Sequence, residues 1–226
     1  MSTQIGLLTE IWKVSNGVGG MLHLDAPFTI SPGQYLQAWR DGDTASLPVI
    51  VYPASVFHDG LLALDKIPSQ WLPGDHIRIT GPLGHGFLLP SDSHFVALLS
   101  PDGDFQRLMP LAQLALGQNA SVSLILGSMT DREDLLSTLP EVMEVHDISN
   151  IQNALLWADF LAIDLKVEDL SNLDSLLGVS QQDSMQVRQG QVLIRGMVPC
   201  AGKAQCGVCA IKTRSGWQFA CEDGPV

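Results

Sequence analysis

Two patterns of apolar residues divide this chain. Up to about residue 90, short apolar segments alternate with polar and turn-forming residues, and they cover residues 5–14, 21–24, 34–39, 48–52, 61–64 and 76–80. Gly-Gly, Pro-Gly and Asp-Gly pairs stand between them, and such pairs favour turns between strands. Many short strands at this spacing predict a closed antiparallel β-barrel over residues 1–90.

From residue 95 the pattern changes, because apolar runs of strand length alternate with helical periodicity. Strands are predicted at 95–100, 121–127 and 160–165, and helices at 105–117, 131–139 and 167–177, with a further segment at 141–148. Strands that alternate with helices are typical of βαβ units on a parallel sheet. The pattern therefore predicts an α/β domain over residues 91–180. Residues 181–190 are polar and predict a linker, and residues 191–195 predict the opening strand of a small C-terminal domain, 191–226.

The chain has four cysteines, and all of them lie in the last 27 residues: Cys200, Cys206, Cys209 and Cys221. Their spacing, C-x5-C-x2-C-x11-C, is one residue longer in the first gap than the plant-type 2Fe–2S pattern. Gly202 and Gly207 can take positive φ where the loop must reverse, which would turn backbone N–H groups toward sulfur. The spacing predicts that these four cysteines ligate a 2Fe–2S cluster. Trp217, between the third and fourth cysteine, is a candidate to shield it from water.

Other roles for the cysteines fit less well. Structural zinc sites usually pair two CxxC knuckles, and this segment has one, from Cys206 to Cys209. A thioredoxin-type CxxC belongs early in a βαβ unit. Structural disulfides need an oxidising compartment, yet neither a basic segment nor the apolar core of a signal peptide follows Met1. Zinc, attaching the C-terminal segment to an assembly interface, stays open as the alternative.

Composition narrows the classes of partner. Charged residues make up 16% of the chain against a usual share of about 25%, while hydrophobic residues reach 46%. A protein partner would cover the excess apolar surface. The formal charge of −12 and the sequence pI of about 4.6 oppose binding to nucleic acid or anionic lipid. No apolar run approaches the ~20 residues that span a bilayer, so we expect a cytoplasmic protein without a membrane span.

Three short motifs carry a resemblance to a known family. PGQY at 32–35 resembles PGQF, GPLGHGF at 81–87 resembles GPLGNGF, and CEDGPV at 221–226 resembles CxDGPVF. With the order of barrel, α/β domain and cysteine segment, the chain resembles the electron transfer subunit of the heteromeric dihydroorotate dehydrogenases, in the ferredoxin reductase superfamily. The resemblance implies an FAD-binding barrel, an NAD-binding α/β domain and a 2Fe–2S domain. It also implies a role in relaying electrons between NADH and a flavin in a partner subunit.

Two cofactor sites of that family are altered here. The flavin strand, Arg-x-(Tyr/Phe)-Ser in the family, corresponds to LPVIV at 47–51, and residues 66–72 lack the glycine that close approach to FAD phosphates needs. The glycine-rich nucleotide turn corresponds to residues 100–110, where Asp102 and Asp104 would repel a pyrophosphate. A later CGP turn corresponds to residues 163–165, with Asp164 at its centre. These changes leave open whether the barrel holds FAD, and they argue against NAD(P).

The sequence thus predicts an iron–sulfur electron-transfer subunit of a heteromeric oxidoreductase. Its cluster would exchange electrons with a flavin or another redox centre on a partner protein, and we identify no catalytic residue in the chain itself. Two alternatives remain: a complete FAD-containing subunit that oxidises NAD(P)H, and a non-catalytic scaffold with a metal-stapled C-terminal segment.

Overall fold

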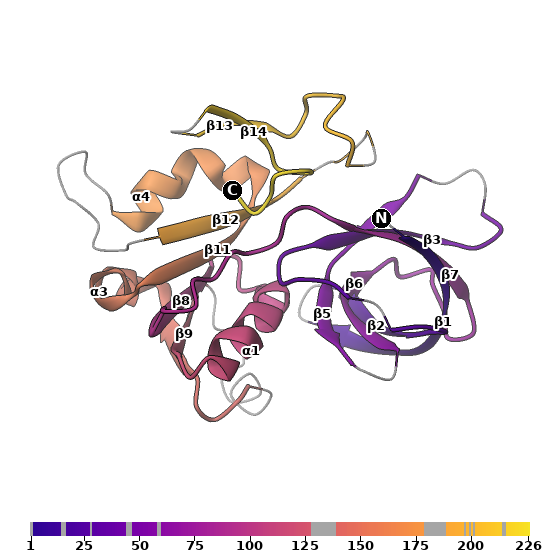
Figure 1. Cartoon of the computed structure of the whole chain (residues 1–226), viewed down its shortest axis with the longest axis horizontal. Helices are drawn as coiled ribbons and strands as arrows, with labels where there is room; N and C mark the ends of the chain where they lie inside the picture. The colour runs from indigo at the N-terminus through magenta and orange to yellow at the C-terminus, as the bar shows by residue number, and fades with distance from the viewer. Residues whose placement is uncertain are drawn as a thin grey trace. The chain divides into compact units, whose positions relative to one another are not determined.

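The computed structural model describes residues 2–14, 17–27, 29–43, 47–57, 60–127, 139–178, 189–196, 198, 200, 202–213 and 216–226. The chain forms two compact units. The first contains residues 1–86 and 197–224, and the second contains residues 87–196 and 225–226. Figure 1 identifies the elements of both.

The first unit is built on an antiparallel sheet of seven strands in the order β4-β3-β7-β1-β2-β6-β5. The strands are β1 (Ser2–Val14), β2 (Gly17–Leu24), β3 (Tyr35–Arg40), β4 (Val49–Val51), β5 (Pro53–Val56), β6 (Leu61–Ile67) and β7 (His76–Leu83). The sheet curls until β4, at one edge, contacts β6, beside the other edge. The predicted barrel is therefore confirmed, as a nearly closed sheet with one short strand, β5, that the sequence pattern did not predict.

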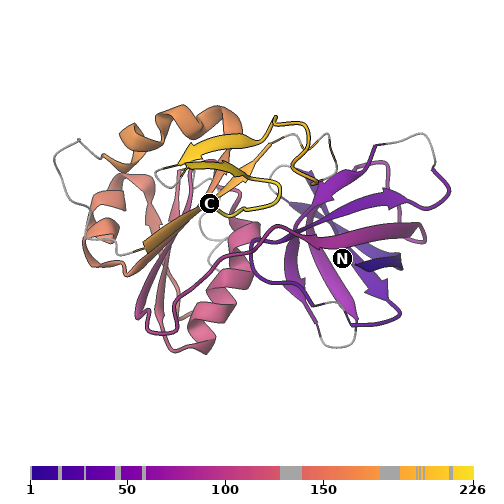
Figure 2. The same ribbon diagram turned by 45° about the horizontal axis from the view of Figure 1, so that its top comes forward.

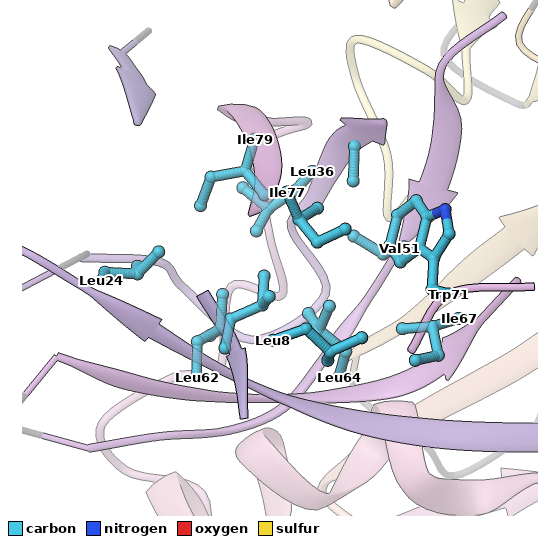
Figure 3. Packing of buried hydrophobic residues seen from close by; sticks show 12 residues of the cluster. Leu8, Leu24, Leu36, Val51, Leu62, Leu64, Ile67, Trp71, Ile77 and Ile79 are labelled. Carbon is cyan, nitrogen blue, oxygen red and sulfur yellow. The ribbon is translucent and has the colours of Figure 1, made fainter. Parts of the chain in front are cut away.

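Alternation along the strands fills the barrel with aliphatic side chains. In β1, Leu8 points inward and is fully buried, whereas Ile5 and Leu7 on the opposite face are 41% and 38% exposed. Leu36, Leu64 and other leucines, isoleucines and valines from six strands meet Leu8 inside (Figure 3). Burial of each such side chain is worth roughly 1.5–3 kcal/mol, so this core fixes the position of the loops at its ends.

The second unit contains a parallel sheet in the order β10-β9-β8-β11-β12. Its strands are β8 (Phe95–Ser100), β9 (Ser121–Leu126), β10 (Glu144–Asp147), β11 (Phe160–Lys166) and β12 (Gln189–Arg195). Its helices are η1 (Phe105–Leu108), α1 (Met109–Gly117), η2 (Ile148–Asn150), α3 (Ile151–Trp157), η3 (Val167–Asn172) and α4 (Leu173–Leu177). Ala97, Leu99 and Ile163 pack against α3 and α4, and α1 covers the other face of the sheet (Figure 2).

The predicted α/β pattern is confirmed in its main elements. The helix predicted at 105–117 forms as η1 followed by α1, and the one at 167–177 forms as η3 followed by α4. Pro110 at the start of α1 suits a first turn, where its missing N–H has no partner to lose. Most of the predicted helix at 131–139 and of the predicted linker at 181–190 lies outside the described residues, which leave out 131–138 and 181–188. Within the described ranges, no helix is long and apolar enough to cross a bilayer.

One predicted strand has a different partner. Residues 191–195 were expected to open the C-terminal segment, but they belong to β12, which pairs in parallel with β11 from Gln189 to Arg195. Leu193 and Ile194 are buried there, so the apolar run completes the larger sheet. The prediction was wrong because an apolar run of strand length does not specify which sheet it joins. The C-terminal segment contains its own hairpin, β13 (Ala210–Thr213) with β14 (Gly216–Phe219).

Candidate metal centre

The three motifs that carry the family resemblance meet in the first unit. Gln34, in the PGQY turn, donates its side-chain amide to the Gly84 carbonyl at 2.8 Å. His85 donates its backbone N–H to the carbonyl of Gly224 at 2.8 Å. Gly84 has φ of 78°, and a Cβ there would lie 2.9 Å from that same carbonyl oxygen. Glycine is therefore required where the C-terminal segment docks on the barrel.

Tyr35 joins the barrel directly to the cysteines. Its ring is buried, and its hydroxyl donates to the backbone carbonyl of Cys221 at 2.7 Å. Burial raises the pKa of the Tyr35 phenol, and the nearby Cys221, Tyr52, Cys209 and Cys200 raise it further, so the hydroxyl stays a donor. Since 186 residues separate Tyr35 from Cys221, this contact depends on the fold and could not be identified from local sequence.

The four cysteines are free thiols that approach one another in two pairs. Cys200 interacts with the Cys206 side chain, and Cys209 shares a hydrogen bond with Cys221. Cys221 also lies close enough to Cys200 for their charges to interact. Cys221 is buried and Cys206 is exposed, so the group extends from the barrel contact to the surface.

Backbone N–H groups of the loop point at two of the sulfurs. Hydrogen bonds from the N–H groups of Cys206 and Gln205 lower the pKa of the Cys200 thiol to about 6. Burial raises the pKa of Cys221 to about 12, and the hydrogen bond with Cys209 adds to this, against a bond from the Ala204 N–H. Such N–H donors stabilise negative sulfur, as is required around thiolate-ligated iron.

The conformation of the loop agrees with its predicted reversals. Gly202 and Gly207 have φ of 73° and 72°, as the sequence predicted, and Ala204 also takes a positive φ of 51°. A Cβ on Gly202 would lie 2.6 Å from the Tyr35 hydroxyl oxygen, so a side chain would push the loop off the barrel. The expected shielding by Trp217 is not found, because its side chain is 68% exposed.

Four cysteine thiols are the residue type that ligates a 2Fe–2S cluster, although they are not assembled into a group that could hold a metal ion. In the part of the chain that the structure describes, no three His, Cys, Asp or Glu side chains form a group that could hold a metal ion. The thiols meet as two pairs instead. A 2Fe–2S cluster needs four thiolates, two on each iron; Cys200, Cys206 and Cys209 before β13 and Cys221 after β14 supply that residue type and number. Metal would also displace the proton that Cys221 otherwise keeps.

Comparison with known proteins finds similarity to electron transfer subunits. It is 26% identical over 234 residues to the dihydroorotate dehydrogenase B (NAD(+)) electron transfer subunit of Clostridium acetobutylicum, covering 95% of this chain and 90% of that one. It is 24% identical to the probable equivalent subunit of Pyrococcus furiosus, covering 97% and 87%. The chain is a divergent homologue of these subunits. No protein-family profile matches it.

The fold of this chain also resembles solved structures. An NADH-dependent reduced ferredoxin–NADP oxidoreductase superposes with a TM-score of 0.70 at 17% identity, covering 97% of this chain and 86% of that one. A ferredoxin reductase of carbazole 1,9a-dioxygenase superposes with a TM-score of 0.63 at the same identity, covering 82% and 66%. These likenesses establish the ferredoxin reductase-type arrangement of an antiparallel barrel and a parallel α/β sheet.

The strand at the family's flavin position is apolar in this homologue. β4 presents Val49, Ile50 and Val51, and Leu47 before it is 82% exposed. The hollow beside it, lined by residues that include Trp39, Leu47 and Trp71, has a volume of about 50 Å³. Arg78 in β7 forms an ion pair with Asp41 and lies over the ring of Trp39.

Proposed function

We propose that this protein is the iron–sulfur electron-transfer subunit of a cytoplasmic oxidoreductase complex. Cys200, Cys206, Cys209 and Cys221 would ligate one 2Fe–2S cluster. When bound, the cluster would take up and release one electron at a time. The observation that supports the proposal is that Cys200 interacts with Cys206 and Cys221 with Cys209, with backbone N–H donors on Cys200 and Cys221, while Tyr35 ties the Cys221 backbone to the barrel.

The residues around the cysteines have complementary roles. The N–H groups of Ala204, Gln205 and Cys206 would offset the negative charge of the thiolates. Tyr35 would hold the last ligand in place through the Cys221 carbonyl, without contributing a charge. Because Cys206 lies at the surface, electrons would have a short path to a redox centre on another protein.

The partner in this proposal is a catalytic subunit that carries a flavin. The relatives are electron transfer subunits of dihydroorotate dehydrogenase, which supports a partner of that type. Val208, between two of the cysteines, is 58% exposed, and Trp217 in β14 is 68% exposed. Large exposed apolar side chains beside the proposed cluster are suited to burial by a partner.

An anaerobic redox titration tests this function. Protein isolated without oxygen, with whatever co-purifies, should show a paramagnetic signal that appears on one-electron reduction with dithionite and disappears on reoxidation. Cys206→Ser should abolish the signal, whereas Val208→Ala, two residues along the same loop, should keep it. A chain that takes no electron, or a signal that survives Cys206→Ser, would refute the relay.

The same preparation separates the alternatives. FAD released from the isolated chain, together with bleaching by NADH, would favour a complete NAD(P)H-oxidising subunit. Zinc without iron would favour a scaffold whose C-terminal segment is stapled by metal.

A further inference from the structure

The second unit has one place where a parallel sheet usually binds a ligand. The chain runs from β8 outward to β9 and β10 on one side, and then returns to add β11 and β12 on the other side. The order of strands thus reverses between β8 and β11. In open α/β sheets, ligands bind outside the carboxyl ends of the strands at such a reversal.

The turn that follows β8 places the carboxylate of Asp102 at the carboxyl end of that strand, beside the reversal. That carboxylate accepts hydrogen bonds from the Ser100 hydroxyl at 3.2 Å, the Asp104 N–H at 3.2 Å and the Arg195 guanidinium at 2.7 Å. The ammonium of Lys166 lies 3.7 Å away. A hydroxyl, a backbone N–H and two cations are the donors that proteins offer to a phosphate group.

A second carboxylate, that of Asp164, pairs with Arg195 and with a further cation, Arg107. Asp164 in β11 is fully buried and accepts a hydrogen bond from Arg107 at 2.7 Å. Its other oxygen pairs with Arg195. Arg107 also pairs with the Asp104 carboxylate at 3.0 Å. Three carboxylates therefore face three cations, and the group is neutral without any bound anion.

The backbone of the turn is also committed to internal bonds. The N–H groups of Gly103 and Gly127 both donate to the Ser100 carbonyl at 3.1 Å. A Cβ at Gly127 would lie 1.8 Å from the Pro101 carbonyl oxygen, so the turn is packed tightly against the end of β9. A pyrophosphate would therefore have to displace bonds within the chain and would meet the negative charge of Asp102.

We propose that the nucleotide crevice of this fold is closed by the chain itself, with the Asp102 carboxylate taking the hydrogen bonds that a bound phosphate would take. The second unit then binds no dinucleotide, and the reducing equivalents that the protein handles arrive through another protein. This inference is independent of the proposed cluster, because its residues all lie in the second unit and its readouts are binding and stability.

The test compares wild-type protein with Asp102→Ala and with the control Asp92→Ala, which removes the same charge from an exposed turn of the same unit. Asp102→Asn serves as a milder variant should the alanine fail to fold. The probes are NADH, followed by its fluorescence, and inorganic pyrophosphate, followed by the melting temperature against sodium chloride of equal ionic strength.

In wild-type protein we expect no saturable NADH binding and no stabilisation by pyrophosphate beyond that of the salt. Asp102→Ala and Asp102→Asn should melt below the control and recover much of the loss in pyrophosphate, because Lys166 then loses its carboxylate partner and Arg195 keeps only Asp164. Saturable NADH binding by wild-type protein would overturn the proposal. Asp102 variants would also overturn it if their melting temperature equals that of Asp92→Ala, or if pyrophosphate does not raise it beyond the effect of sodium chloride.

Discussion

Among the contacts that fix the cysteine segment, the hydrogen bond of the Tyr35 hydroxyl is the easiest to test, because Tyr35→Phe removes one oxygen atom and keeps the ring. The hydroxyl donates to the Cys221 carbonyl at 2.7 Å within a buried environment. Leaving a buried acceptor unpaired costs about 1–3 kcal/mol. If this cost destabilises the docked state of the cysteine segment, the population in which the segment is detached from the barrel rises about 5- to 150-fold.

Hydrogen exchange read by mass spectrometry measures this population. The amides of His85 and Gly86 donate to the Gly224 carbonyl, so they exchange when the C-terminal segment detaches. Peptides covering residues 81–87 and 216–226 should exchange faster in Tyr35→Phe. Thr80→Val is the control, because it removes an exposed hydroxyl that bonds Thr3 on the same barrel. Equal exchange in Tyr35→Phe and wild-type protein would show that the hydroxyl does not hold the segment.

Two further predictions concern stability. Gly84→Ala should lower the free energy of unfolding in urea by about 1–2 kcal/mol more than Gly74→Ala, since both glycines have positive φ but only Gly84 faces the Gly224 carbonyl; equal losses would refute the docking role. Burial alone would raise the pKa of Asp102, but the hydrogen bond and charge of Arg195 outweigh it and lower the pKa to about 2. The folded state then binds fewer protons than the unfolded state below about pH 4, so stability should fall as pH drops from about 4 to 2. Acid unfolding of Asp102→Asn should lack this component, and an unchanged acid transition would contradict it.

Much of the fold follows from local pattern. Strand-length apolar runs with turn pairs identified the barrel, and the change of period at residue 95 identified the parallel sheet. The positive φ at Gly202 and Gly207 also followed from the sequence, because a loop that brings three cysteines together must reverse. These features depend on neighbouring residues, which a single sequence displays.

Features that depend on distant residues were not predictable. Asp102 and Asp104 were recognised as unfavourable for a pyrophosphate, but their cations were not, because Arg195 lies 93 residues from Asp102. The partner of β12 was missed for the same reason, because the residues of a strand do not specify which strand it pairs with. For Tyr35, the sequence indicates only that a hydroxyl is added where the family motif has phenylalanine; its acceptor lies 186 residues away.

The central claim is that the four cysteines hold iron and sulfide, and quantitative metal and acid-labile sulfide analysis of anaerobically purified protein tests it most directly. The account predicts about two iron and about two sulfide atoms per chain, both lost in Cys221→Ser and both retained in Val208→Ala. About one zinc per chain without sulfide, or no metal in protein that is otherwise folded, would contradict it.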